Sequence, residues 1–197
     1  MRKRVRGSAG EDDDADADQA LETSVLTVRN CIHYSAPVEK RYVLELLKAL
    51  DEASEAALQY CTYPTDAVVY LYVHSEGGDA FAGLSAMDHI RNNRVPVVTV
   101  ADGFVASAAT FLLLGGTERK SMRNAKILIH QLSTAFWGKY ADLLDEVENS
   151  RELMESFRNV YGQHTKLRGK QLDSLLRKEL HMNAEKSLSC GMVDEIW

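Results

Sequence analysis

Apolar positions along the 197-residue chain form short continuous runs that alternate with stripes spaced three or four residues apart. The short runs, rich in β-branched and aromatic residues, predict strands at 24–28, 31–34, 67–73, 95–100 and 125–130. The spaced stripes predict helices at about 38–60, 81–90 and 140–165, and Asn183 is placed to cap a last short helix that ends at Gly191. Strands that alternate with helices predict right-handed β-α-β crossovers, a parallel sheet and therefore an α/β fold.

Length and composition are ordinary for one globular domain. The chain is 45% hydrophobic and 26% charged, and it is long enough to bury a sizeable core. We expect this domain to span residues 24–197, after a charged, disordered tail over 1–23 that is either an interaction arm or a leader without a role. The tail is basic at its start, but no apolar segment follows, so we expect no secretory signal. The acidic residues from Glu11 onward argue against a transit peptide.

Charge, hydropathy and cysteine usage argue against several other classes. The net charge of −6 argues against general nucleic-acid binding, and no run approaches the ~18 apolar residues of a membrane span. The three cysteines are dispersed and show neither Cys-x-x-Cys nor His-Glu-x-x-His spacing, which predicts reduced thiols and no zinc site. We therefore expect a cytoplasmic protein without a metal or an organic cofactor.

The stretch from Gly103 to Leu114 carries the first candidate chemistry. A predicted strand leads into a turn at Asp102-Gly103, Ser107 then stands among small residues, and an apolar run follows. A serine on a sharp strand-to-helix turn exposes its hydroxyl beside the first N–H groups of the helix, which suits a nucleophile and its oxyanion. The alternative is a buried helix start in which Ser107 serves only as the N-cap.

Two further strand ends carry residues that complement a serine nucleophile. Gly77-Gly78 offers backbone N–H groups with no side chain in the way, and His130 ends another predicted strand. The carboxyl ends of parallel strands meet at the edge where α/β folds bind ligands, so we expect these residues to converge on Ser107. An activated serine needs a base and oxyanion donors. A lone histidine at a strand end is more often structural, but the coincidence of all three favours catalysis.

Four segments, in matching order and spacing over the last two thirds of the chain, resemble the Clp protease proteolytic subunit family (ClpP), which are self-compartmentalised serine peptidases. Leu71–Gly78 resembles the family's strand that ends in Ser-Pro-Gly-Gly, and Asp102–Ala108 resembles its nucleophile segment. Ile127–Gln131 resembles Met-Ile-His-Gln, and Gly191–Ile196 resembles the closing Gly-Leu-Val-Asp. The resemblance implies a ClpP/crotonase-like fold of repeated β-α-β units, in which 140–165 is the helix of the handle region.

The resemblance also implies catalytic roles. Ser107 would be the nucleophile, His130 the general base, and the N–H groups of Gly78 and Ala108 the oxyanion hole. The family places an aspartate shortly before the last short helix, where this chain has Glu179. A glutamate can orient an imidazole, but its carboxylate lies one methylene farther out.

Three departures from the family pattern leave questions open. The acid position holds Glu179 rather than aspartate, and Asp173 is the other nearby candidate; a solvated helix charge is the alternative for both. Glu76 replaces the usual proline and would put an acidic group beside the cleft. The N-terminus lacks the family's recognisable axial-loop sequence.

The function implied by the resemblance is that of an ATP-dependent-type serine endopeptidase. Such an enzyme hydrolyses peptides and unfolded proteins inside a homo-oligomer of stacked heptameric rings, fed by an AAA+ unfoldase. Two alternatives remain: a catalytically silent structural ring subunit, and a crotonase-type acyl-CoA enzyme, which shares the fold and the oxyanion hole. The presence of both Ser107 and His130 favours the peptidase.

Overall fold

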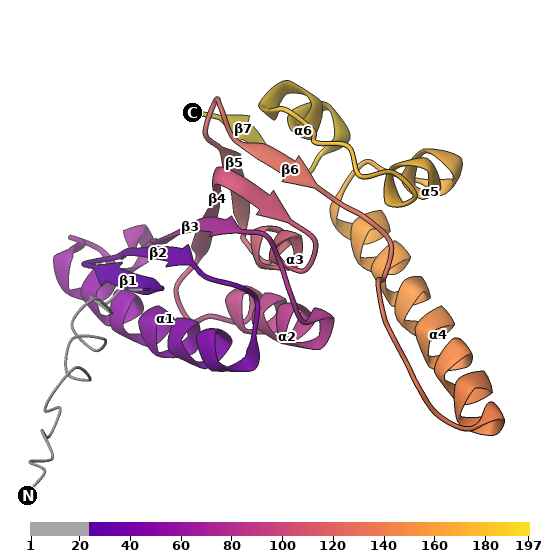
Figure 1. Cartoon of the computed structure of the whole chain (residues 1–197). Coiled ribbons are helices and arrows are strands. Elements are labelled where there is room, and N and C mark those ends of the chain that lie inside the picture. The colour runs from indigo at the N-terminus through magenta and orange to yellow at the C-terminus, as the bar shows by residue number, and fades with distance from the viewer. Residues whose placement is uncertain (1–23) are drawn as a thin grey trace, which may run out of the picture.

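A seven-stranded sheet forms the centre of the computed structural model, which describes residues 24–197 (Figure 1). The predicted tail over 1–23 lies outside the described residues. The strands are β1 (Val25–Val28), β2 (Cys31–Ser35), β3 (Val69–Ser75), β4 (Val97–Ala106), β5 (Glu118–Ser121), β6 (Lys126–Leu128) and β7 (Glu195–Ile196). They lie in the order β1-β2-β3-β4-β5-β7, and β6 pairs with β4. The β1–β2 hairpin is antiparallel, and the remaining strand pairs are parallel, as the α/β pattern predicts.

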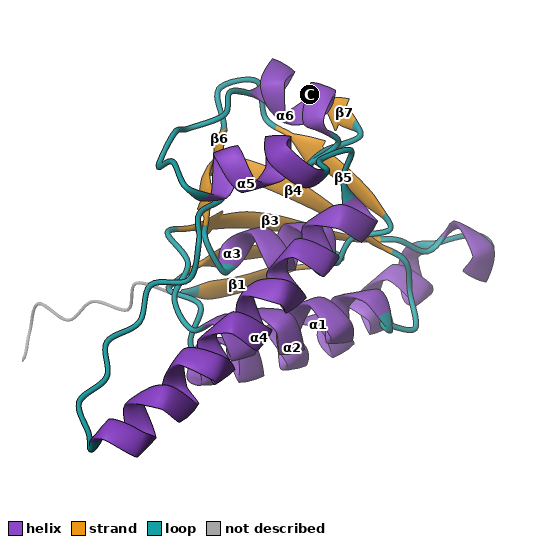
Figure 2. Ribbon diagram, turned by 90° about the vertical axis from the view of Figure 1, so that its right-hand side faces the viewer, coloured by secondary structure: helices purple, strands orange, loops and turns teal. Residues whose placement is uncertain are grey.

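Helices cover the sheet and extend beyond it. They are α1 (Lys40–Tyr60), α2 (Ala80–Arg91), α3 (Ala109–Leu114), α4 (Tyr140–His164), α5 (Gly169–Leu176) and α6 (Ala184–Cys190), with a 3-10 turn at Pro64–Asp66. The group α1, α2 and α3 lies against one face of the sheet, whereas the N-terminal half of α4 projects away from it (Figures 1 and 2). Within residues 24–197, no helix is both long and apolar enough to cross a bilayer.

The last short helix begins and ends as its sequence predicts. The Asn183 side chain accepts a hydrogen bond of 2.9 Å from the Lys186 N–H, which satisfies one of the free donors at the start of α6. Gly191 ends the helix with a φ of 72°, a left-handed conformation that glycine adopts without steric cost.

The central strand β4 is longer than its sequence indicates, and the predicted turn at Asp102-Gly103 is wrong. The strand continues to Ala106 because Gly103, with a φ of 75°, lets it bend without ending. Before the bend it pairs with β5, and after the bend, from Phe104, it pairs with β6. Its register with β3 also shifts there, between Val73 and Ser75. This bend sends the end of β4, and Ser107 after it, toward β6.

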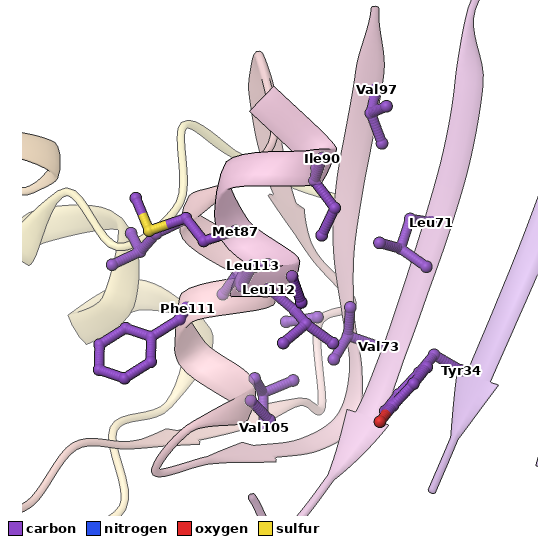
Figure 3. Packing of buried hydrophobic residues seen from close by; sticks show 14 of the residues in the cluster. Tyr34, Leu71, Val73, Met87, Ile90, Val97, Val105, Phe111, Leu112 and Leu113 are labelled. Carbon is purple, nitrogen blue, oxygen red and sulfur yellow. The ribbon is translucent and has the colours of Figure 1, made fainter. Parts of the chain in front are cut away.

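The core lies between the sheet and the helices α1 to α3. In Figure 3, Leu71, Val73 and Val97 point from the strands toward Leu112 and Ile90 on α3 and α2. All six residues of α3 are buried, so the helix that follows Ser107 is anchored by packing on all sides. The site is therefore built on rigid elements.

Candidate active site

Ser107 lies on a sharp turn between β4 and α3. Its φ is +55°, a value that residues with a side chain rarely adopt. This conformation costs about 1–3 kcal/mol, so contacts with the surrounding structure must hold it in place. The surroundings do so: the Ser107 N–H donates to the Leu128 carbonyl at 2.9 Å, and the Ser107 carbonyl accepts from the Thr110 N–H at 3.0 Å. A residue held at positive φ between a strand and a helix has the backbone conformation of the nucleophile elbow seen in hydrolases.

Gly77 fits directly against this turn. A Cβ atom at Gly77 would lie 2.6 Å from the Ser107 Cβ and 2.7 Å from the Ala106 carbonyl oxygen. Its φ of +98° is also in a region that favours glycine. The β3–α2 connection therefore approaches Ser107 as closely as it does only because residue 77 has no side chain.

Gly78 is held from its other side by the segment before α1. The Val38 N–H donates to the Gly77 carbonyl at 2.8 Å, and the Val38 carbonyl accepts from the Asp79 N–H at 2.7 Å. Within residues 24–197, no protein group accepts from the N–H of Gly78 or of Ala108, so both donors are available. Each residue thus offers an unpaired backbone N–H, which is the kind of donor that an oxyanion hole uses.

His130 lies two residues beyond the end of β6. Its Nδ1 atom is 2.6 Å from the Gln131 carbonyl oxygen, which can only accept, so Nδ1 carries the hydrogen in the neutral ring. Nε2 is then the unprotonated nitrogen, as a general base requires. The described residues show no hydrogen bond between His130 and Ser107. Hydrogen bonds between a candidate base and its nucleophile are often formed only when substrate binds.

Ser107 and His130 line one cavity of about 250 Å³. Gly78 and Ala108 line it as well, as do Glu76 and the aromatic residues Phe111, Phe157 and Tyr161. The structure thus brings together four of the residues that the sequence singles out, at the carboxyl ends of the strands where α/β folds bind their ligands. In the described part of the chain, no group of three or more His, Cys, Asp and Glu residues is placed to hold a metal ion.

Comparison with known proteins decides the family. The profile of the family described as Clp protease matches residues 35–197. The chain belongs to the Clp protease family. One relative, the ATP-dependent Clp protease proteolytic subunit of Deinococcus radiodurans, is 30% identical over 130 residues, which cover 65% of this chain and 64% of that relative. The expected family and the α/β fold are thereby confirmed.

Neither of the two candidate acids, Asp173 and Glu179, forms a hydrogen bond with His130 in the described part of the chain. Asp173, on α5, forms an ion pair of 3.1 Å with Arg158, so its carboxylate already has a partner. Glu179 is exposed, and among residues 24–197 nothing pairs with its side chain. Neither acid contacts His130, whose Nδ1 atom is directed to a backbone carbonyl instead.

Backbone pairing brings the segment that contains Glu179 alongside the segment that contains His130. Met182 and Ile127 exchange two backbone hydrogen bonds in an antiparallel bridge, and the Gln131 N–H donates to the Leu176 carbonyl at 2.7 Å. The segment from 176 to 182 therefore runs alongside residues 127 to 131, which include His130, and Glu179 lies between the two points of attachment. The assignment of Glu179 as the third triad residue stays a prediction.

A hydrogen-bonded relay behind Ser107 is the part of the site for which the sequence has no signal. The Thr110 hydroxyl is 2.6 Å from the Ser107 carbonyl oxygen and 2.7 Å from the Tyr161 hydroxyl. Since a carbonyl can only accept, Thr110 donates to Ser107 and Tyr161 donates to Thr110. Burial raises the pKa of Tyr161, so its hydroxyl stays protonated and the relay stays intact. The relay ties the turn at Ser107 to α4.

Proposed function

We propose that this chain is a serine endopeptidase that hydrolyses peptides and unfolded polypeptides through an acyl-enzyme on Ser107. The observation that carries the proposal is the cavity shared by Ser107 and His130 in a chain of the Clp protease family. A crotonase-type acyl-CoA enzyme would need neither the strained serine nor the histidine with its free Nε2.

The proposed reaction follows from these positions. Nε2 of His130 takes the Ser107 proton while Oγ attacks the scissile carbonyl. The N–H groups of Gly78 and Ala108 stabilise the tetrahedral oxyanion, and His130 then gives its proton to the leaving amine. Water attacks the resulting ester, again with His130 as the base. Glu179 would stabilise the imidazolium once the ring turns its Nδ1–H from the Gln131 carbonyl to the carboxylate.

Covalent labelling tests the chemistry. A fluorophosphonate probe should modify Ser107 stoichiometrically, and Ser107→Ala should lose both labelling and peptide hydrolysis, with kcat falling by about 10⁶. Ser133, which lines the same cavity, provides the matched control, because Ser133→Ala should still label. Labelling at another serine with Ser107 unmodified would contradict the mechanism, and no labelling at all would favour the silent ring subunit.

We further propose that copies of this chain assemble through the projecting part of α4. Large apolar side chains are exposed along this part and the loop before it, namely Phe136, Trp137, Tyr140, Leu143, Leu144 and Val147. Trp137 is 96% exposed, which is costly for a residue of that size unless a partner covers it. Stacked heptameric rings, an AAA+ unfoldase partner and a cytoplasmic location are the family expectations that extend this proposal.

Native mass spectrometry tests the assembly. The wild-type chain should give an oligomer whose mass is a multiple of seven subunits. Replacement of Trp137 and Leu144 by serine should shift the mass toward smaller species while the circular dichroism spectrum is retained. A monomeric wild-type chain would exclude assembly through this surface.

A further inference from the structure

The catalytic cavity adjoins a larger groove of about 570 Å³. The two hollows share four lining residues, Gly78, Ala80, Leu132 and Ser133, so they form one continuous surface depression. The groove continues from these residues to the middle of α4, where Leu153 lines it. A peptide whose scissile bond lies at Ser107 would therefore extend along the groove.

The charged side chains that line this depression, apart from His130, are all acidic. Glu76 lines the part that holds Ser107, whereas Asp79, Glu146 and Glu152 line the groove. Among the residues described, no lysine or arginine lines either part.

Three of these carboxylates are available to a ligand. Asp79 is partly occupied, because it accepts from the Ala82 N–H at 2.8 Å as the cap of α2. Within residues 24–197, the side chains of Glu76, Glu146 and Glu152 make no hydrogen bond or ion pair.

Two neighbouring glutamates on α4, in contrast, form ion pairs with arginines of the same helix. Glu148 pairs with Arg151 and Glu155 with Arg158, and neither glutamate lines the groove. These two glutamates are thus paired within the chain, whereas the two glutamates of α4 that line the groove are not.

The walls between the carboxylates are apolar. Phe81 and Leu153 line the groove together with Leu132. Lysine and arginine side chains have apolar stems that pack on such surfaces while their charged ends remain beside carboxylates. An acidic substrate side chain would meet the same carboxylates with like-charge repulsion.

We propose that this groove selects peptides that carry positive charge, with Glu76 as the specificity-determining residue beside the scissile bond and Glu146 and Glu152 acting farther along the peptide. The inference rests on the proposed peptidase function and names its substrate class. The apolar walls accept the stem of the side chain, and the unpaired carboxylates distinguish lysine from a neutral residue of the same shape.

Matched peptides test the inference. Internally quenched peptides should differ only at the residues that flank one scissile bond, which carry lysine, norleucine or glutamate, and mass spectrometry should locate the cut. The wild-type kcat/KM should be about two- to fivefold higher for lysine than for norleucine, and lower again for glutamate. Glu76→Gln should abolish most of the lysine-to-norleucine difference, whereas the matched control Glu148→Gln, outside the groove, should leave it unchanged.

A second set of peptides carries the lysine several residues from the cut. For these peptides, the preference for lysine should be reduced by the double variant Glu146→Gln, Glu152→Gln rather than by Glu76→Gln. Sodium chloride gives a measurement that needs no variant: the wild-type preference for lysine should shrink between about 20 and 500 mM salt. Equal cleavage of lysine and norleucine peptides, or a preference that Glu76→Gln does not reduce, overturns this inference alone. Absence of cleavage of every peptide, with no fluorophosphonate labelling, overturns the proposed function with it.

Discussion

Replacement of Gly77 by alanine tests how the turn that carries Ser107 is held in place. The new Cβ would lie 2.6 Å from the Ser107 Cβ, whereas ordinary contact begins at 3.4 Å, so Ser107 or its neighbours must move by about 0.8 Å. A displacement of about 1 Å costs a catalyst on the order of 100-fold in rate. Because Gly77 is itself buried between β3 and the turn, it has little freedom to move instead.

Stability should fall as well, but not enough to unfold the chain. The positive φ at Gly77 costs alanine about 1–3 kcal/mol, and overpacking costs about 1–3 kcal/mol more. Since each kcal/mol lowers the Tm of a chain of this size by about 2–4 °C, we expect a decrease of roughly 5–20 °C. Calorimetry measures this decrease, and the rate of fluorophosphonate labelling measures the displacement of Ser107.

Gly169 provides the matched control. It too has a positive φ, +46°, but nothing lies within 4 Å of the Cβ that alanine would add. Gly169→Ala should therefore lower the Tm slightly and leave labelling at the wild-type rate. The reasoning fails if Gly77→Ala folds and labels as fast as the wild type, or if both variants slow labelling equally.

Three further predictions concern elements around the site. Tyr161→Phe keeps the ring but removes the hydroxyl that donates to Thr110, so it should lower the free energy of unfolding by about 0.5–1.5 kcal/mol and slow fluorophosphonate labelling. If Thr110→Val has the same effect in the wild type and in the Tyr161→Phe variant, the two hydroxyls are not coupled. Asn183→Ala should cost about 1 kcal/mol by urea denaturation, while Asn183→Ser, which keeps a capping oxygen, should cost much less. Desolvation, with the charge of Arg91 as a further cause, lowers the pKa of His164 in the folded chain. As the pH falls, His164 is therefore protonated in the unfolded chain before it is protonated in the folded one. The free energy of unfolding should accordingly fall as the pH drops below about 6.5. His164→Gln should flatten the pH dependence of Tm between pH 7 and 5.5, and an unchanged slope would refute the assignment.

Periodicity and local chemistry predict most of the elements correctly. The long helix α4 follows from its amphipathic stripe, and α6 follows from its asparagine cap and terminal glycine. The strand before Ser107 was harder, because Asp102-Gly103 has the composition of a turn. Only the two successive partners of β4, first β5 and then β6, show that Gly103 bends the strand instead of ending it.

The candidate site was predictable where residue type alone carries the chemistry. Ser107, Gly78 and His130 stand out because each follows a strand, and the sheet brings strand ends together. The carbonyl that holds the His130 ring and the hydroxyl of Tyr161 were not predictable. The first is backbone, which every residue has, and the second lies 51 residues away from its partner Thr110.

The pairing between β6 and the segment at 176–182 has a consequence for how the protein folds. Ile127 is hydrogen-bonded to Met182 and Gln131 to Leu176, so the segment around His130 is bordered by residues much farther along the chain. The turn that carries Ser107 is held by nearer partners, Thr110 and Leu128. Because contacts between residues far apart in the sequence cost more chain entropy to close, the surroundings of His130 are completed after the turn at Ser107.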